Sequence, residues 1–269
     1  MAEDVRQPDI TAILTAHAEG TMVRVSFRSM LAAVRLATEA GLDVEMLVVL
    51  DKPDEATREM LAEVDTHGAR LLEVSYGDQA PVRNHAVRES HGRFIAFLDG
   101  DDLWTENWLV EAHALCAAEP QTIAHPYADW VFGEHRSLSF PPDQNDPQFD
   151  PATLRVTNAW DALCLAPRDA YLDHPFQARA LAQGYAFEDW LWNLDTVRAG
   201  YVHRVVRDTI HFKRSRSGSQ FRQATGNKST TRPTPYHDYA WLKEWDGALK
   251  REPGPPPAPR SVHRGQTWA

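Results

Sequence analysis

The sequence predicts an α/β protein with a mostly parallel central sheet flanked by helices. In the first hundred residues, four short apolar segments alternate with amphipathic segments, and this alternation is the pattern of βαβ units. The apolar segments are hydrophobic almost without interruption, as expected of strands that are buried on both faces. No internal repeat of the solenoid type is present in the sequence.

The four strands are expected at residues 10–14, 44–50, 70–74 and 94–98. The second and third connecting helices are expected at residues 54–66 and 80–91. Between the first two strands, Phe27, Met30 and Val34 recur at helical spacing. Gly41 follows this segment and can take the left-handed conformation that often ends a helix. The first connecting helix should therefore end just before Gly41.

The second half of the chain has a less regular pattern. Residues 102–200 are rich in tryptophan, and a proline-dense segment, residues 140–151, lies at their centre. Proline neither donates to a sheet ladder nor continues a helix, so this segment predicts a long loop. Such loops are either lids over a site or disordered, and both interpretations stay open here. Residues 251–259 are of low complexity and predict an extended tail.

The composition is that of an ordinary globular protein, with 43% hydrophobic and 25% charged residues among 269. A formal net charge of −10 argues against a general nucleic-acid or anionic-membrane surface. Cys116 and Cys164 lie far apart, which excludes a disulfide framework and fits a reducing compartment. The apolar segments are shorter than the roughly 20 residues that cross a bilayer, and the acidic start does not resemble a signal peptide. We therefore expect a cytoplasmic protein.

Three carboxylates, Asp99, Asp101 and Asp102, come directly after the fourth predicted strand. Ligands of open α/β sheets bind at the carboxyl ends of the strands. Two aspartates separated by one small residue can face a single site, and Mg²⁺ or Mn²⁺ binds carboxylate and phosphate oxygens. Gly100 would leave room for a bulky ligand. The segment predicts a metal and phosphate site; the alternative is a solvated Asp-Gly turn.

These carboxylates belong to a series of motifs whose order resembles that of the inverting glycosyltransferases of family 2. The series is Thr15-Ala16-His17-Ala18-Glu19-Gly20, Val48-Val49-Leu50-Asp51, Ala80-Pro81-Val82-Arg83-Asn84-His85-Ala86, Phe97-Leu98-Asp99-Gly100-Asp101-Asp102-Leu103-Trp104, Phe187-Glu188-Asp189-Trp190 and a basic segment around His211. The resemblance implies the GT-A fold, which is a Rossmann-like nucleotide-diphospho-sugar transferase fold. It also implies transfer from a UDP-sugar to a glycan or lipid-linked acceptor in cell-surface polysaccharide synthesis.

The resemblance further implies how the chain is divided. A nucleotide-sugar-binding half would span residues 10–103, and an acceptor-binding half of the same domain would span residues 104–220. An N-terminal arm at residues 1–9 would precede them, and a C-terminal extension at residues 221–269 would follow. Contact with the inner face of a membrane would come through a lipid-linked acceptor.

Individual residues receive roles from the same resemblance. The nucleotide-sugar-binding set is Thr15, Ala16, His17, Glu19, Asp51, Arg83, Asn84, Asp99, Gly100, Lys213 and Arg214. Asp51 would accept a hydrogen bond from the uracil imide. Asp101 would bind Mn²⁺ or Mg²⁺, which offsets the charge of the diphosphate leaving group. His211, after a late strand, would complete the metal or diphosphate shell, and the basic loop that follows would close over the donor.

An inverting transfer also needs a base that removes the proton of the acceptor hydroxyl. The resemblance places this base at Asp189 and an acceptor-hydroxyl contact at Glu188, with an exchange of the two roles left open. A carboxylate at a helix N-terminus is held ionised by the helix dipole. Trp160 is the expected platform for an acceptor sugar ring.

Two other functions stay open at this stage. A catalytically silent sugar-nucleotide or glycan-binding protein would need no base, so Asp101 and Asp189 argue against it. A phosphatase of the haloacid dehalogenase type also carries Asp-x-Asp after an apolar strand. That motif normally continues to Thr or Val, where this chain has Leu103, and its strand is usually the first of the domain rather than the fourth.

Overall fold

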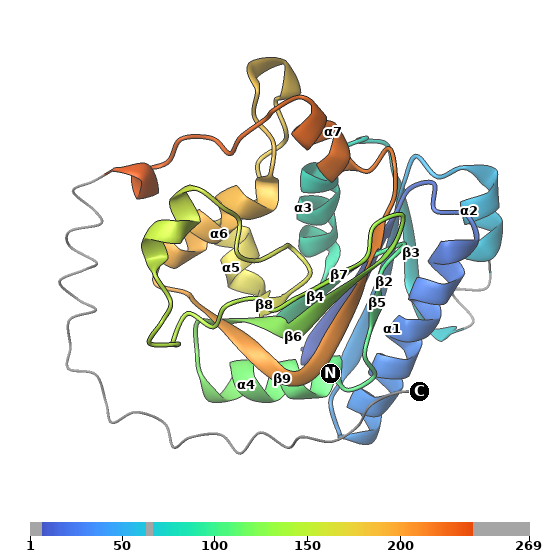
Figure 1. Ribbon diagram of the computed structural model, residues 1–269. Coiled ribbons are helices and arrows are strands. Elements are labelled where there is room, and N and C mark those ends of the chain that lie inside the picture. Colours follow the sequence, from blue (N-terminus) through green and yellow to red (C-terminus); the bar gives the residue numbers. More distant parts are fainter. Residues whose placement is uncertain (1–6, 63–66, 239–269) are drawn as a thin grey trace, which may run out of the picture.

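A computed structural model describes residues 7–62 and 67–238 of the chain (Figure 1). Within these residues the strands are β1 (Ile10–Ala16), β2 (Val44–Asp51), β3 (Arg70–Val74), β4 (Phe94–Asp99), β5 (Leu103–Trp104), β6 (Thr122–Gly133), β7 (Ser137–Ser139), β8 (Leu165–Pro167) and β9 (Val202–Ser215). The helices are α1 (Thr21–Glu39), α2 (Glu55–Met60), α3 (Gln79–Glu89), α4 (Trp108–Ala118), α5 (Arg168–Asp173), α6 (Glu188–Arg198) and α7 (Gln220–Gly226). The short 3-10 helices are η2 (Pro151–Arg155), η3 (Leu181–Gln183) and η4 (Pro235–His237). The predicted tail at residues 251–259 lies outside the described part of the chain.

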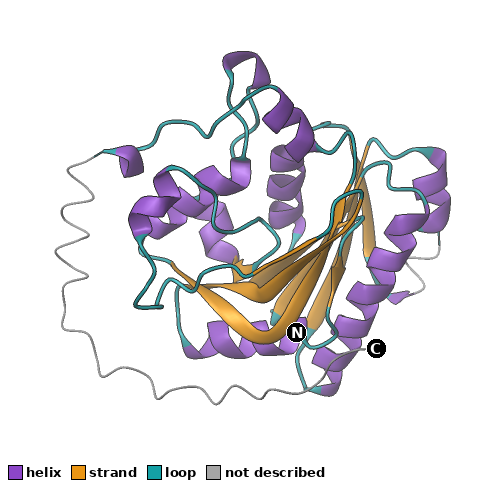
Figure 2. Ribbon diagram, in the orientation of Figure 1, coloured by secondary structure: helices purple, strands orange, loops and turns teal. Residues whose placement is uncertain are grey.

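The strands form one curled mixed sheet in the order β3-β2-β1-β4-β8-β6-β9-β5, with β7 paired to β6 (Figure 2). The first four strands of the chain pair in parallel, as the sequence predicts. β8 pairs with β4 in the antiparallel direction and so joins the second half of the chain to the first. The sheet is therefore parallel at the β3 side and mixed at the β5 side.

Helices cover both faces of this sheet. α1 and α4 pack against one face, where Ile10, Leu14 and Val48 are fully buried. α3, α5 and α6 pack against the other face, on Ile13 and Phe97. Consecutive residues of β1 point to opposite faces, so Ile10, Ala12, Leu14 and Ala16 face one layer and Thr11, Ile13 and Thr15 face the other. The two threonines are buried, and their hydroxyl groups donate hydrogen bonds to Glu45 and Asp99.

The first half of the chain follows the sequence prediction closely. α1 ends at Glu39, and Gly41 has a φ of +89°, which is the left-handed conformation expected after the helix. α2 is shorter than predicted and ends at Met60, although residues 63–66 of the predicted segment are not described. Asp54 and Asp78 begin α2 and α3 with side-chain hydrogen bonds to Thr57 N and Ala80 N, respectively.

Two glycines are needed because main chains approach each other closely. A Cβ atom at Gly92 would lie 2.3 Å from the Thr11 nitrogen, so only glycine fits between α3 and β4. A Cβ atom at Gly100 would lie 2.8 Å from the Ala16 Cβ atom. The Gly100 N–H donates to Thr15 O at 2.8 Å, which docks the acidic turn onto the end of β1. The room that Gly100 leaves is thus occupied in part by β1.

The proline-dense segment at residues 140–151 is a loop, as predicted, and it is held along β9. Gln144 N donates to His203 O at 2.8 Å, and His203 N donates to the Gln144 side chain at 2.9 Å. Arg204 Nε donates to Asp143 at 2.9 Å. These contacts fix the loop in place, so the disordered alternative does not describe it.

The basic segment differs from its prediction. β9 runs from Val202 to Ser215, so His211, Lys213 and Arg214 lie within the strand rather than in a loop after it. β9 pairs with β6 over most of its length and with β5 at its end. None of the helices in the described residues is both long and apolar enough to span a membrane.

Candidate active site

Two adjoining cavities open at the carboxyl ends of β1, β2 and β4. The first measures about 470 Å³, and its lining includes Thr15, Ala16, His17, Glu19, Asp51, Gly100, Asp101 and Arg216. The second measures about 500 Å³, and its lining includes Arg83, Asp161, Phe187, Glu188, Asp189 and Lys213. Residues that line both cavities form a shared wall: Gln79, Asp99, Asp102, Arg179, Arg214, Ser219, Gln220 and Phe221.

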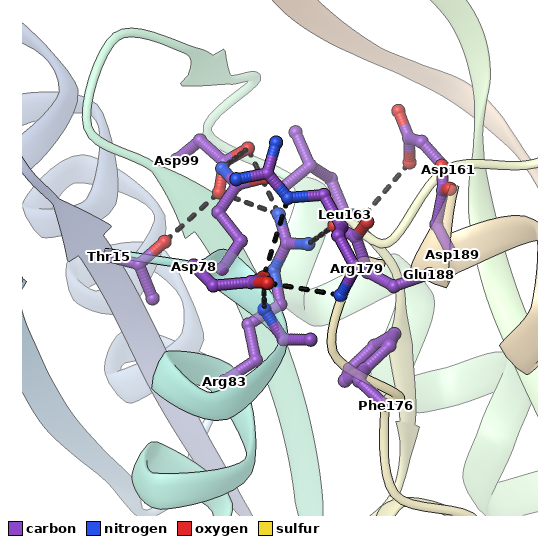
Figure 3. A network of polar contacts seen from close by, with 12 residues as sticks. Thr15, Asp78, Arg83, Asp99, Asp161, Leu163, Phe176, Arg179, Glu188 and Asp189 are labelled. Carbon is purple, nitrogen blue, oxygen red and sulfur yellow. Dashed lines mark hydrogen bonds and ion pairs between the residues drawn. The ribbon is translucent and has the colours of Figure 1, made fainter. Parts of the chain in front are cut away.

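An ion-pair network ties the acidic turn after β4 to the start of α6 (Figure 3). Arg83 Nη2 lies 2.9 and 3.1 Å from the two carboxylate oxygens of Asp99, and Arg83 Nη1 lies 3.4 Å from Glu188 Oε1. Asp99 also accepts a hydrogen bond from Thr15 Oγ1 at 3.0 Å. Burial alone would lower the pKa of Arg83, but the carboxylates of Asp99 and Glu188 raise it above its usual value. Arg83 therefore stays charged and connects the two cavities.

Asp51 lies at the end of β2 and faces the first cavity, where the resemblance predicts it. Its two carboxylate oxygens accept hydrogen bonds from Tyr76 N at 2.6 Å and Gly77 N at 2.7 Å. A carboxylate has about four acceptor positions, so lone pairs remain available to a ligand. His17 packs on the same strand end, and its Nδ1 atom bonds Asp51 O. The uracil role of Asp51 stays a prediction.

A guanidinium group lies between the carboxylates at the far end of the first cavity. Arg216 Nε is 2.8 Å from Asp101 Oδ2, and Arg216 Nη2 is 3.3 Å from Glu19 Oε1. Burial is the main reason why the pKa of Asp101 and that of Glu19 are raised. Arg216 was not among the predicted residues. The sequence signal that could have identified Arg216 is its position two residues after Arg214, which is already in the predicted set, because alternate residues of an extended chain share one face.

Asp102, the third carboxylate of the turn, connects it to β9. It is 6% exposed, and its Oδ1 atom accepts a hydrogen bond from Arg214 N at 2.7 Å. Burial first, and then the nearby charges of Asp99 and Asp101, raise its pKa well above the usual value. The turn thus brings three carboxyl groups close together, and two of them, those of Asp99 and Asp101, are paired with guanidinium groups.

The oxygen donors at this end of the first cavity fit a divalent metal ion. Mg²⁺ retains several water molecules and phosphate oxygens and is usually held by one or two carboxylates, which Asp101 and Glu19 can supply. Arg216 occupies the position of a cation between these two side chains. In the part of the chain that the structure describes, no three His, Cys, Asp or Glu side chains form a metal-binding group.

His211 does not join Asp101 in this arrangement. The ring is fully buried, lines neither cavity, and lies 4.5 Å from the Trp108 ring between centroids. Burial lowers the pKa of His211 to about 3, so the imidazole is neutral. The predicted place of His211 in the metal or diphosphate shell is therefore corrected: the side chain belongs to the core beneath β5.

The second cavity contains Asp189 on the first turn of α6. Phe187, just before it, has φ 62° and ψ 61°, a left-handed conformation that is unfavourable for a bulky residue and often marks a functional site. Asp189 Oδ2 accepts a hydrogen bond from Asn158 Nδ2 at 2.9 Å, and Oδ1 accepts one from Trp190 N at 2.8 Å. Glu188 lies beside it, bound to Arg83.

Burial, and then the charge of Glu188, raise the pKa of Asp189 to about 7. Burial and the charge of Glu188 thus oppose the ionisation of Asp189 that the helix dipole was expected to favour. A carboxyl group with a pKa near 7 is well matched to accept a proton at neutral pH.

Lys213 lies in the second cavity and not in the first, where a nucleotide contact was expected. Its ammonium group forms ion pairs with Asp161 and, at 3.8 Å, with Asp129. Burial would lower the pKa of Lys213, but the two carboxylates raise it. The same contact holds the pKa of Asp161 below its usual value despite burial. The charge of Lys213 is thus neutralised by carboxylates of the protein itself.

Replacing Asp129 by asparagine should stabilise the protein at alkaline pH. Burial and the charge of Asp161 raise the pKa of Asp129 to about 7, and its Oδ1 atom is buried without a hydrogen-bond partner. The folded protein therefore binds a proton there between about pH 4 and 7 that the unfolded chain releases, and Asp129 weakens the fold as pH rises through this range. We expect Asp129→Asn to gain about 1 to 3 kcal/mol at pH 8.

Urea unfolding at pH 4 and pH 8 measures this effect. At pH 4 the Asp129 carboxyl group is protonated in the folded protein and carries no charge to destabilise it, so the variant and the natural protein should differ little. An equal gain at both pH values would mean that the carboxylate charge is not the cause.

Trp160 and Asn84 have structural roles that differ from those predicted. Trp160 is 2% exposed, stacks on His203 at 4.2 Å between ring centroids, and donates from Nε1 to Pro142 O at 2.8 Å. Asn84 exchanges two hydrogen bonds with the main chain of Phe176, at 2.7 and 2.9 Å. Neither side chain lines a cavity. Both are corrected to core and loop-anchoring residues.

The segment that borders both cavities is α7 with the residue before it, and not the proline-dense loop. Ser219, Gln220 and Phe221 line the first and the second cavity. Residues 140–151 line neither, so the alternative of a lid does not describe them. The Phe221 side chain is exposed and its ring lies 6.1 Å from that of Phe187.

Comparison with known proteins shows the class of the fold and the family of the chain. The fold resembles that of solved glycosyltransferases. TarS of S. aureus in complex with UDP-GlcNAc has a TM-score of 0.61 at 15% identity, covering 90% of this chain and 66% of that chain. The mannosyltransferase PcManGT from Pyrobaculum calidifontis, in complex with GDP-Man and Mn²⁺, has a TM-score of 0.56 at 15% identity, covering 90% and 70%. The expected GT-A fold is confirmed.

The chain belongs to glycosyl transferase family 2, because the sequence model of that family matches residues 11–154, which are more than half of the chain. Two curated relatives agree. The UDP-Glc:alpha-D-GlcNAc-diphosphoundecaprenol beta-1,3-glucosyltransferase WfgD of Escherichia coli is 41% identical over 66 residues, or 24% of this chain and 26% of WfgD. The putative teichuronic acid biosynthesis glycosyltransferase TuaG of Bacillus subtilis is 36% identical over 69 residues, or 24% and 27%. The matched segment thus spans about a quarter of each relative.

Proposed function

We propose that the protein transfers a sugar from a UDP-sugar to a hydroxyl group of a glycan or lipid-linked acceptor, with inversion at the anomeric carbon, in the synthesis of a cell-surface polysaccharide. One observation carries the proposal: a cavity lined by the carboxylates of Asp101 and Glu19, with a cationic side chain between them, adjoins a cavity with a buried carboxyl group whose pKa is near 7. The names of WfgD, TuaG and TarS support the donor and the pathway class.

The first cavity would hold the donor. Asp51 would accept the imide N–H of uracil at the end of β2, and His17 would line the same end. Asp99 is held in one orientation by Arg83 and Thr15, so it can accept hydrogen bonds from the ribose and the donor sugar without rearranging. Asp101 and Glu19 would hold a divalent cation, which supplies positive charge to the diphosphate leaving group.

The second cavity would hold the acceptor. Asp189 would take the proton of the acceptor hydroxyl while that oxygen forms a bond to the anomeric carbon. The bond between that carbon and the diphosphate oxygen breaks on the opposite face, and UDP leaves with the electron pair. Because Asn158 and the Trp190 N–H fix the orientation of Asp189, the base is aligned before the acceptor arrives.

The competing functions make different demands on the site. Family membership gives no support to a phosphatase. A silent binding protein would bind UDP and produce no transfer with any donor. It would also gain nothing from a buried carboxyl group with a raised pKa, which lowers stability at neutral pH.

Titration of UDP by calorimetry, with and without Mn²⁺, tests the donor site. We expect UDP to bind in the presence of the metal ion, and we expect Asp101→Asn to weaken that binding about tenfold or more, because one charge-assisted contact is worth that amount. Asp173→Asn is the matched control, because Asp173 is exposed and lines neither cavity. Metal-independent binding that Asp101→Asn leaves unchanged would contradict the proposed metal site.

A panel of UDP-sugars tests the transfer itself. One donor should be hydrolysed slowly in the absence of acceptor, and the released sugar should have the opposite anomeric configuration when it is first formed, as followed by NMR. Retention of the configuration, or no turnover of any donor, would contradict the proposed reaction.

A further inference from the structure

Arg179 is a cationic side chain of the shared wall that neither the motifs nor the proposed mechanism uses. It follows α5 in an irregular segment, between the exposed residues Gln177 and Ala178 and η3. Its own side chain turns inward and is only 10% exposed. It lines both cavities. Figure 3 shows the Arg179 side chain reaching across Arg83 toward Asp99.

The guanidinium group of Arg179 has no hydrogen-bond partner among the described residues. Its Nε and Nη1 atoms are buried without an acceptor, and no acceptor is recorded for Nη2. The nearest carboxylate, that of Asp78, is 3.6 Å from Nε, beyond hydrogen-bond distance. Buried donors without acceptors are rare in folded proteins, and those that occur call for a ligand or an ordered water.

The main chain holds Arg179 in this position. Arg179 N donates to Asp78 Oδ2 at 3.0 Å, and Asp78 in turn begins α3 through its bond to Ala80 N. Phe176, three residues earlier, is clamped by Asn84 on the same helix. The guanidinium group is therefore fixed by α3 at the junction of the cavities, as a preorganised binding group would be.

The position at the junction points to the sugar of the donor rather than to the diphosphate. If the diphosphate lies beside Asp101 and the base is Asp189, the transferred sugar must lie between them, against the shared wall. Arg216 is paired with Asp101 and so lies on the diphosphate side, whereas Arg179 is paired with Asp78 at the start of α3. Asp99 is already bound by Arg83, and the Asp78 carboxylate lies beyond hydrogen-bond distance, so the acceptors that the Arg179 guanidinium group lacks would come from the substrate.

We propose that Arg179 binds a carboxylate on the transferred sugar, so that the natural donor is a UDP-linked acidic sugar of the hexuronate class. The planar fork formed by Nη1 and Nη2 matches the two oxygens of a carboxylate. This inference rests on the proposed function and goes beyond it by naming the class of donor sugar. The same fork could also bind phosphate oxygens of the nucleotide, and the experiment separates the two sources.

Calorimetry in the presence of Mn²⁺ with UDP-glucuronate, UDP-glucose and UDP tests the assignment. The natural protein should bind UDP-glucuronate about tenfold or more tightly than UDP-glucose, the effect of one charge-assisted pair. Arg179→Gln should bring the two affinities within about threefold of each other and leave that for UDP unchanged. Arg179→Lys, which keeps the charge and loses the fork, should lose most of the preference.

Arg232→Gln is the matched control, because Arg232 donates to Ala178 O at 3.3 Å, lines neither cavity, and tests a disturbance of the loop alone. It should keep the preference for UDP-glucuronate. The melting temperature of Arg179→Gln should stay within about 2 °C of the natural value, because no hydrogen bond of the guanidinium group is lost. A fall of more than about 5 °C would mark Arg179 as structural and overturn the inference.

The remaining outcomes separate this inference from the proposed function. Equal affinity of the natural protein for UDP-glucuronate and UDP-glucose would overturn the acidic-sugar assignment alone. If Arg179→Gln lost as much affinity for UDP as for UDP-glucuronate, the guanidinium group would be assigned to the diphosphate. This result would also overturn the acidic-sugar assignment. Failure of the natural protein to bind UDP at all would overturn the proposed function, and this inference with it.

Discussion

Asp189→Asn is expected to remove sugar transfer and to leave UDP binding intact. Positioned general bases contribute about 10²- to 10⁴-fold to a rate, and an amide cannot accept the proton. Asparagine has the same shape and keeps an acceptor oxygen for the Trp190 N–H. The hydrogen bond from Asn158 is lost, because the Asn158 amide is held in its orientation by Asn193, but this contact lies in the second cavity and not at the UDP site. UDP affinity by calorimetry and the transfer rate with saturating donor measure the two properties separately. A parallel loss of both would show that Asp189 supports the fold of the site instead.

The pH dependence of the rate gives a second test of the same residue. Only the ionised form of Asp189 can accept a proton, and its pKa is raised to about 7. Transfer should therefore rise about tenfold per pH unit below pH 7 and level off above it. Glu188→Gln serves as the matched control: it should weaken the acceptor contact but keep a rise of this kind. A rate that is flat between pH 5.5 and 8.5 in the natural protein would contradict the assignment.

The parallel half of the sheet was predictable because its signals are local. β1, β2 and β4 are largely apolar runs bounded by polar residues, and all four strands begin at the predicted residue, although the residues of β3 are exposed or half-buried. The register of β1 and β4 is fixed by two buried faces, so a pattern in the sequence is enough to place their carboxyl ends. The residues predicted from those ends, such as Asp51, Asp99 and Asp101, accordingly line the cavities.

The second half was harder to predict because its structure depends on contacts between distant residues. Trp160 is buried by His125 of β6 and His203 of β9, and only the pairing of those two strands brings the three rings together. His211 is enclosed in the same way by Trp108, a hundred residues away in the sequence. A histidine or a tryptophan at such a position gives the same local signal whether it is in the core or in a site.

The basic residues show where a pattern helps and where it does not. Arg214 lies at the end of β9, and Arg216, two residues on and just beyond the strand, lines the same first cavity, as the alternation of a strand would suggest. Lys213 faces the other way, toward Asp161, and so lies in the second cavity. Arg179 follows an irregular loop with no periodicity, and only its burial without hydrogen-bond partners distinguishes it from a surface arginine.

Arg83→Met is expected to destabilise the protein by about 3 to 5 kcal/mol, the usual cost of removing one partner of a buried ion pair. Arg83 is 3% exposed, and its loss would leave Asp99 and Glu188 as neighbouring carboxylates without their cation. The guanidinium group also lies over the rings of Phe97 and Phe176, at 6.0 and 5.8 Å from their centroids, so packing is lost as well. Urea unfolding at pH 7 measures the change.

The matched control is Arg35→Met. Arg35 pairs with Glu39 at 2.8 Å, nearly the same distance, but the Arg35 side chain is 81% exposed. Exposed pairs of this kind are screened by water and salt, so the control should change stability very little. The double variant Arg83→Met/Asp99→Asn should lose less stability than the two single variants added together, because the second change removes a charge that the first leaves unpaired. If Arg83→Met were no more costly than Arg35→Met, the ion-pair network would not be what holds the acidic turn against α6.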